Sequence, residues 1–159
     1  MAIRKLRYEG DPILNKVCKP VYDMTDRVME LIEDMAETMY ETGGVGLAAP
    51  QVGILKRICV IDVTPDCSEL LVLINPEIIE TSGSQTGTEG CLSVPNKSGT
   101  VTRPNVVRVK ALNTNMEEVI IEGTELLARA LCHEIDHLDG KLYVDLVEGD
   151  LETYDGDED

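Results

Sequence analysis

The only two histidines of the chain, His133 and His137, stand four residues apart in the segment Cys132–His137. On an α-helix, positions i and i+4 lie one above the other on the same face, so both imidazoles can reach one metal ion. Glu134 lies about 100° further round such a helix, because the repeat is ~3.6 residues per turn. It can therefore reach a water molecule on that ion without being a ligand. This H-E-x-x-H arrangement is typical of metal-dependent hydrolases and predicts a helix that carries a metal site.

The composition is that of a chain that buries one hydrophobic core. Its 159 residues correspond to a single domain by length, and 43% of them are hydrophobic. No stretch approaches the ~18 consecutive apolar residues that a membrane span requires, and the charged N-terminus lacks the apolar segment of a signal peptide. The five cysteines are odd in number and show no paired spacing. We therefore expect a reduced, cytoplasmic setting and no membrane association.

Much of the net charge of −16 lies at the C-terminal end. Residues 148–159 carry seven acidic side chains and no basic one. A segment of this kind is usually solvated, so we expect a catalytic domain over residues 1–147 and a disordered acidic tail over residues 148–159. The acidic balance also argues against direct nucleic-acid binding, which requires a basic face.

The hydrophobic pattern predicts an α+β fold with two helices. Apolar residues recur at helical spacing from about Thr25 to Glu41, with acidic residues between them, so an amphipathic helix is expected in the N-terminal part. The helix that carries the histidines is expected from Thr124 to near Gly140. Because this C-terminal helix is more hydrophobic than a surface helix needs to be, it should be largely buried against the sheets.

The region between the helices is expected to form β-strands. Its apolar runs are rich in β-branched residues and are bounded by turn residues. The expected strands cover residues 58–63, 70–74, 106–112 and 117–121, with a short edge strand at 141–145. Most connections are too short for βαβ crossovers, so antiparallel sheets should pack around the metal-binding helix.

Two histidines leave the metal site incomplete, because catalytic zinc sites commonly take three protein ligands and one solvent position. With no other histidine, the third ligand must be a thiolate or a carboxylate. Glu148 and Glu152 are downstream carboxylates, but they lie in the acidic segment just beyond the helix. Cys91 is the better candidate, because its glycine- and proline-bounded segment can form a loop that presents the sulfur to the helix. The other four cysteines are interpreted as small buried hydrophobic residues: Cys18, Cys59, Cys67 and Cys132.

Three segments together resemble the signature motifs of bacterial peptide deformylases. They read GVGLAAPQ at residues 44–51, EGCLS at residues 89–93 and HEIDH at residues 133–137. Their order and separations are similar to those of the family, and the resemblance covers roughly residues 1–147. It implies a metal site formed by Cys91, His133 and His137, with Fe²⁺ as the native ion and Zn²⁺ or Ni²⁺ as replacements. It also implies hydrolysis of the N-formyl group of formylmethionine on newly made polypeptides, with release of formate.

The residue types suit that chemistry. A bound divalent ion lowers the pKa of water, which then attacks the formyl carbon near neutral pH. Glu134 would take the proton of this water and pass it to the departing amine. The oxyanion that develops needs hydrogen-bond donors, and the side-chain amide of Gln51 and the backbone N–H of Leu92 are the candidates.

The resemblance also implies how a peptide binds. The glycine-rich segment brings Gln51 to the metal and offers bare backbone around Gly44 and Gly46 to an extended peptide. By analogy with the family, main-chain groups of Val45 and Gly90 would pair with the substrate like an added strand. The expected partners are therefore N-formylmethionyl nascent peptides.

Two further features follow from the resemblance. Arg103 is similar to a family arginine that pairs with Glu89. Some family members carry a long basic C-terminal helix that touches the ribosome, whereas this chain has an acidic C-terminal segment. That segment gives no support to docking through such a helix, and we expect only transient proximity to the ribosome.

Two other functions are compatible with the motif helix. A zinc endopeptidase would use the same helix with a glutamate as third ligand. A non-catalytic domain with a structural metal would need four protein ligands, and Cys132 is the only other nearby thiol. Because Cys132 precedes His133, it should point about 100° away from it on the helix.

Overall fold

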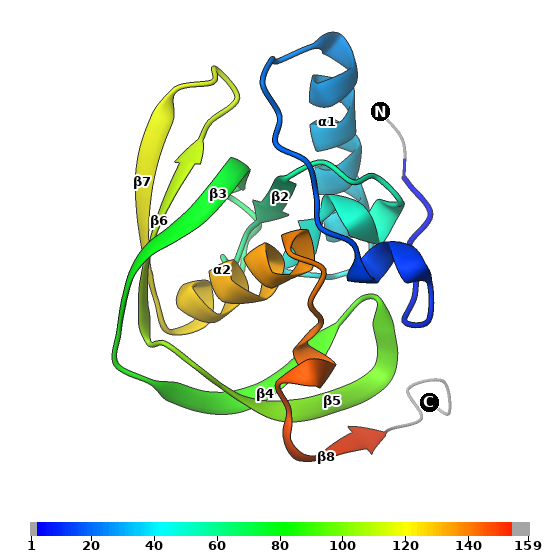
Figure 1. The fold of residues 1–159 in the computed structure, drawn as a ribbon, viewed down its shortest axis with the longest axis vertical. Coiled ribbons are helices and arrows are strands. Elements are labelled where there is room, and N and C mark those ends of the chain that lie inside the picture. The colour runs from blue at the N-terminus through cyan, green and yellow to red at the C-terminus, as the bar shows by residue number, and fades with distance from the viewer. Residues whose placement is uncertain (1–2, 154–159) are drawn as a thin grey trace.

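The computed structural model describes residues 3–153, which form two antiparallel sheets around a central helix (Figure 1). The five-stranded sheet has the order β1-β2-β3-β6-β7, and its strands are β1 (Gly46–Ala48), β2 (Ile58–Ile61), β3 (Leu71–Ser82), β6 (Val106–Leu112) and β7 (Glu118–Thr124). The three-stranded sheet has the order β4-β5-β8, with β4 (Gln85–Cys91), β5 (Val94–Arg103) and β8 (Glu148–Thr153). The helices are α1 (Asp26–Glu41) and α2 (Glu125–Leu138), with short 3-10 turns η1 (Pro12–Asn15), η2 (Ala49–Val52) and η3 (Tyr143–Asp145). The predicted α+β class with antiparallel sheets is confirmed.

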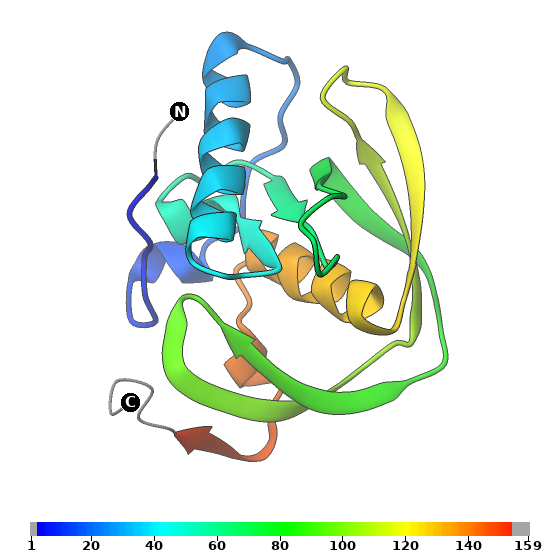
Figure 2. The same cartoon turned by 180° about the vertical axis from the view of Figure 1, so that it is seen from behind.

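Strands β1 and β2 lie between the two helices (Figures 1 and 2). Their side chains point alternately toward α1 and toward α2. Leu47, Ile58 and Val60 pack in the cluster that contains the apolar face of α1. Ala48 and Cys59, next to them in sequence, pack instead in the cluster around α2. This follows from the two-residue period of a strand, which sends successive side chains to opposite faces.

Helix α1 forms where the apolar spacing predicts it. The hydroxyl oxygen of Thr25 accepts a hydrogen bond from the backbone N–H of Val28 at 3.2 Å, which satisfies one of the unpaired donors at the helix start. The side chains that face the core recur three or four residues apart and are buried: Val28, Leu31, Ile32, Met35 and Met39. The helix therefore covers one face of β1 and β2 and leaves Glu30, Glu33 and Glu41 exposed. Asp34 departs from the predicted acidic outer face, because it is buried and accepts a hydrogen bond from Nε of Arg4 at 2.9 Å.

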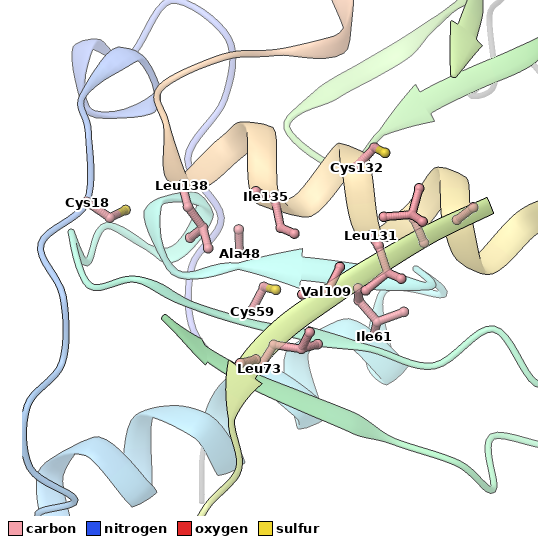
Figure 3. Close-up of a cluster of buried hydrophobic side chains, with 14 residues drawn as sticks. Cys18, Ala48, Cys59, Ile61, Leu73, Val109, Leu131, Cys132, Ile135 and Leu138 are labelled. Carbon is pink, nitrogen blue, oxygen red and sulfur yellow. The ribbon is translucent and has the colours of Figure 1, made fainter. Parts of the chain in front are cut away.

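Helix α2 lies in the middle of the molecule, packed against the inner face of the five-stranded sheet (Figure 3). Leu131, Ile135 and Leu138 of the helix share a buried cluster with residues of β1, β2, β3 and β6. The predicted burial of the motif helix is therefore confirmed. Such packing matters for a metal site, because ligands must be held by rigid surroundings. Within residues 3–153, no helix is long and apolar enough to cross a membrane.

Three expectations need correction. Lys141–Asp145 is not an edge strand: Tyr143–Asp145 forms the 3-10 turn η3, in which the carboxylate of Asp145 accepts the N–H of Leu142 at 3.3 Å. Cys67 is exposed, unlike Cys18, Cys59 and Cys132, because it lies in the turn after β2 with a positive φ of 56°. Disorder from residue 148 onward is wrong for Glu148–Thr153, which forms β8.

Strand β8 is ordered because it adds backbone and side-chain contacts to β5. The two strands pair antiparallel, with Ser98 opposite Glu152. Leu151 packs on the cluster of Val94, Val101 and Tyr143, and Glu148 accepts a hydrogen bond from the hydroxyl of Thr102 at 2.6 Å. These contacts outweigh the effect of the acidic side chains, which had led us to expect a solvated segment. Residues 154–159 of the predicted tail lie outside the described part.

A buried cluster of charges joins the three-stranded sheet to α2. The carboxylate of Glu89 on β4 accepts hydrogen bonds from Arg103 of β5 at 2.8 and 2.9 Å and from Arg129 of α2 at 2.6 Å. Arg103 also binds Asp136 of α2 at 2.6 Å. The expected pairing of Arg103 with Glu89 is thus present, and it is buried rather than superficial. Burial by itself would raise the pKa of Glu89, but the hydrogen bonds from Arg103 and His133 outweigh it and hold this pKa at about 2.

This low pKa predicts how stability depends on pH. The carboxyl of Glu89 titrates near 4.5 in an unfolded chain and at about 2 in the fold, so its contribution is present above 4.5 and is lost as pH falls toward 2. A shift of that size corresponds to about 3 kcal/mol. In metal-free protein, Glu89→Gln should therefore lower the free energy of unfolding by about 3 kcal/mol at pH 7 and by clearly less at pH 3.

Urea unfolding at the two pH values measures this difference. Glu122→Gln is the matched control, because the contact of Glu122 with Arg108 is exposed and 3.8 Å long, so its loss should cost under ~1 kcal/mol. An equal effect of Glu89→Gln at pH 7 and pH 3 would show that the ionised carboxylate is not what stabilises the cluster.

Candidate metal centre

Three potential ligands converge between β4 and α2. The ligand atoms of Cys91, His133 and His137 all lie within 4.8 Å of one another. Cys91 ends β4 at an irregularity in its pairing with β5, and this brings its sulfur to 3.3 Å from Nε2 of His137. The histidines lie one turn apart on α2, with ring centroids separated by 5.0 Å. The helical spacing and the strand end together form one cluster of donors.

The orientation of His133 is fixed by groups outside this cluster. Its Nδ1 lies 2.9 Å from Oε1 of Glu89. Since the carboxylate of Glu89 can only accept, Nδ1 carries a proton, and Nε2 is the nitrogen left for an ion, which would displace any proton that Nε2 carries. The ring also stacks on Tyr143 at 6.0 Å, and the hydroxyl of Tyr143 donates to the carbonyl of Lys97 at 3.1 Å. Strands β4 and β5 therefore hold the ring of a helix residue in place.

His137 is ready to act as a ligand in a different way. It is fully buried, and among the described residues its Nδ1 has no hydrogen-bond partner. Burial holds the pKa of His137 well below its ordinary value, so the ring is neutral. Neutral imidazole is the form that binds metal ions.

The donor set fits a divalent transition-metal ion. A zinc ion with bonds of ~2.3 Å to sulfur and ~2.0–2.1 Å to nitrogen would separate the two donors by about 3.6 Å in tetrahedral geometry, close to the 3.3 Å between Cys91 and His137. Burial alone would lower the pKa of His133, yet the negative charge of Glu134 and the contacts with Cys91 and Glu89 raise it well above its usual range. Glu134, Cys91 and Glu89 therefore favour a positive charge at this position, which a bound cation would supply. Sulfur and imidazole donors suit zinc or iron better than magnesium or calcium.

The alternative ligands lie elsewhere in the described part of the chain. Glu148 is on β8 and binds Thr102, and Glu152 pairs with Ser98 along the same sheet. Neither belongs to the cluster of possible ligands within residues 3–153. Cys132 is buried in the hydrophobic cluster around α2 and is also not a member of it. Within residues 3–153 the cluster thus consists of one cysteine and two histidines. It matches neither the ligands of a zinc endopeptidase, which include a glutamate, nor the four protein ligands of a structural site.

Glu134 lies beside the ligands without being one of them. Its side chain is 4% exposed, and Oε1 has no hydrogen-bond partner among residues 3–153. Burial raises the pKa of Glu134 to about 7, although the neighbouring charge of His133 acts in the opposite direction. A carboxyl group with a pKa near neutrality can both accept and return a proton under physiological conditions.

Gln51 directs an amide N–H toward the cluster. It lies in η2 and is 1% exposed. The backbone N–H of Ala48 donates to Oε1 of Gln51 at 3.0 Å, which fixes the orientation of the amide. Its Nε2 donates to the hydroxyl of Ser93 at 3.1 Å and lies 3.5 Å from the sulfur of Cys91. The side chain thus presents a preorganised donor next to a metal ligand.

A cavity of about 340 Å³ opens onto these groups. Its wall combines the glycine-rich segment, β4 with the turn that follows it, and one face of α2. The lining residues are Gly44, Val45, Gly46, Gln51, Thr88, Glu89, Gly90, Cys91, Leu92, Leu126, Arg129, Ala130, His133 and Glu134. Every residue that the sequence assigned to catalysis or substrate binding lies in this wall, and His137 is next to it through Cys91.

Sequence reasoning missed several residues of the site. Arg129 precedes His133 by four positions, so helical spacing places both on one face of α2 and could have identified it. Ser93 follows the cysteine motif directly and holds the amide of Gln51. Tyr143 carried no such signal, because its stacking on His133 depends on the path of the chain after α2.

Comparison with known proteins identifies the family. The sequence profile described as "Polypeptide deformylase" matches residues 3–151. The chain is 62% identical to the peptide deformylase of Agathobacter rectalis over 151 residues, which cover 95% of this chain and 94% of that protein. It is 57% identical to the peptide deformylase of Lachnoclostridium phytofermentans, with 99% of each chain covered.

Solved structures agree with this assignment. A peptide deformylase from Legionella pneumophila superposes with a TM-score of 0.89 at 47% identity, covering 92% of this chain and 86% of that one. A peptide deformylase from Synechococcus elongatus, solved in complex with actinonin, gives a TM-score of 0.87 at 42% identity, with 92% and 79% covered. The range matched by the family profile, residues 3–151, includes all three segments that build the cavity. The chain therefore belongs to the peptide deformylase family, whose members are metalloenzymes that remove the N-formyl group from nascent polypeptides.

Proposed function

We propose that this chain removes the formyl group from the N-terminal formylmethionine of newly made polypeptides and that Cys91, His133 and His137 hold the ion that the reaction requires. The observation that carries the proposal is the convergence of one thiol and two imidazoles within 4.8 Å, beside a buried carboxyl group. We further propose that the catalytic domain is a single unit that extends through β8, because that strand pairs with β5.

The ion is proposed to be Fe²⁺ in the native protein, with Zn²⁺ or Ni²⁺ able to replace it, since a cysteine and two histidines suit all three. Such an ion supplies a water molecule of lowered pKa and polarises the formyl oxygen. The protein supplies the remaining parts of the reaction. Nδ1 of His133 donates to Glu89, so the ring stays in the tautomer that leaves Nε2 for the ion.

Glu134 is proposed to move the proton. Its carboxylate takes a proton from the attacking water and then gives it to the nitrogen of the methionine as the carbon–nitrogen bond of the formamide breaks. The products are formate and a free amino terminus. The pKa of about 7 that burial gives Glu134 suits both halves of this transfer.

Two donors are proposed to bind the oxygen on which negative charge develops. Nε2 of Gln51 is one, because Ala48 holds the amide in the required orientation. The backbone N–H of Leu92, next to Cys91, is the other. Donors fixed before the reaction stabilise the transition state without reorganisation, and removing one typically costs 10²–10³-fold in kcat.

The peptide is proposed to bind as an added strand along the cavity. Main-chain groups of Val45 and Gly90 would pair with it, and the backbone at Gly44 and Gly46 lines the same cavity. The side chains of Val45 and Leu126 line the cavity and are 43% and 50% exposed, so they can cover an apolar methionine side chain.

A nascent-chain substrate implies that the enzyme works in the cytoplasm, transiently near the ribosome. A net charge of −16 argues against contact with nucleic acid.

The most direct test is an anaerobic assay of the metal-loaded protein. A formyl-Met tripeptide should release formate in proportion to metal content, measured on the same sample. Protein that carries one ion per chain and releases no formate would overturn the proposal.

Removal of the proposed third ligand should abolish metal binding. Cys91→Ser replaces a thiolate by a hydroxyl, a poor ligand for these ions, so we expect less than ~10% of the metal content after dialysis. Cys67→Ser is the control, because that thiol is exposed and does not belong to the ligand cluster. Metal binding of wild-type strength in Cys91→Ser would favour a carboxylate ligand and an endopeptidase-like site.

Removal of the proposed proton carrier should leave the metal site intact. Glu134→Gln keeps the size of the side chain but cannot accept the proton, so we expect a loss of about 10²–10⁴-fold in kcat with unchanged metal content. Glu125→Gln, at the exposed start of the same helix, should retain activity. Turnover by Glu134→Gln at the wild-type rate would refute its role.

A further inference from the structure

No hydrogen bond from the part of the chain that the structure describes holds the carboxyl group of Glu134 in place. Oε1 is buried and has no partner among residues 3–153. Glu89 is the opposite case, since two arginines and a histidine bind its oxygens. A proton carrier must lie within about 2.6–3.2 Å of the atom that it serves, directly or through one water. The position of Glu134 must therefore come from the shape of its surroundings.

Gly46 on β1 provides that shape. A Cβ atom added to Gly46 would lie 2.5 Å from Oε2 of Glu134 and 2.9 Å from both Cδ and Cγ. Favourable contacts between carbon atoms lie at about 3.5–4.0 Å, so any side chain at this position would occupy the space of the glutamate. The end of the Glu134 side chain thus rests on the bare backbone of the strand.

The backbone at Gly46 does not itself require glycine. Its φ lies outside the left-handed region, in contrast to Gly43 three residues earlier, which has a φ of +77°. Gly46 pairs with Ile61 across β1 and β2 in regular antiparallel register, which alanine adopts equally well. Ala48, two residues further on the same face of the strand, is packed against α2 (Figure 3). The glycine is therefore explained by the space that Glu134 needs.

We propose that Gly46 is a positioning residue for Glu134, an inference that rests on the proposed role of Glu134 in proton transfer. The strand is fixed by its pairing with β2, whereas the end of the glutamate side chain can turn about its own single bonds to relieve a close contact. An added methyl group would consequently displace the carboxyl group rather than the strand. The N–H and C=O of residue 46 would remain, so pairing with a peptide would be retained.

Steady-state kinetics separate this role from peptide binding. Gly46→Ala should lower kcat for a formyl-Met peptide by about 10²-fold, with KM within about threefold of wild type and one ion per chain. Gly90→Ala is the comparison, because Gly90 also lines the cavity and a Cβ there would have the carbonyl oxygen of Lys97 as its nearest neighbour, at 3.6 Å. Crowding of the peptide would raise KM in both variants. A higher KM with unchanged kcat in Gly46→Ala would overturn the proposal.

A second measurement does not depend on activity. Gly46→Ala should lower the melting temperature when Glu134 is present, and should have no such effect in a Glu134→Ala background, where the space is vacant. The double variant should fold even if Gly46→Ala alone does not. An equal loss of stability in both backgrounds, or a double variant that does not fold, would show that the glycine serves the strand and not Glu134. Wild-type protein that releases no formate would refute the proposed function instead and leave this comparison intact.

Discussion

The carboxylate of Glu89 accepts hydrogen bonds from Arg103 of β5, from Arg129 of α2 and from His133 within the metal cluster. These bonds join the three-stranded sheet to α2, together with the contact of Arg103 with Asp136 and the hydrogen bond from Arg129 to the carbonyl of Val101. The strand that carries Glu89 also carries Cys91, so the register of β4 against α2 sets the distance between the sulfur and the imidazoles. A buried carboxylate with this many donors is stable only when all of them are in place, which gives the site a single geometry.

The site also requires the backbone of β1 to pass close to helix α2. Gly46 and Ala48 lie on the face of β1 that packs against α2, and a Cβ at Gly46 would lie 2.5 Å from Oε2 of Glu134. The following turn η2 places Gln51 beside Cys91. The glycines of this segment thus serve more than backbone flexibility: Gly46 faces Glu134, and a Cβ at Gly44 would meet the side chain of Leu92 at 2.8 Å.

Local patterns in the sequence predicted the helices and the pair of histidines, because both depend on the 3.6-residue repeat alone. Cys91 was harder, since nothing local distinguishes a ligand from a small buried residue, and the choice depended on its turn-like setting. Contacts between distant segments were out of reach: the arginine pair on Glu89 and the stacking of Tyr143 on His133 depend on how β4, β5 and η3 fold over α2. Strand β8 was missed for a related reason, because its acidic composition describes its exposed side chains and not the backbone pairing with β5.

The central claim is that one thiolate and two imidazoles from β4 and α2 share a single ion. X-ray absorption at the zinc edge of zinc-loaded protein measures this directly. The structure predicts one sulfur at ~2.3 Å and two nitrogens at ~2.0–2.1 Å, with the remaining position filled by a light atom. A coordination shell that contains only nitrogen and oxygen would contradict the claim, because the convergence of Cys91 with the histidines would then have no part in holding the metal.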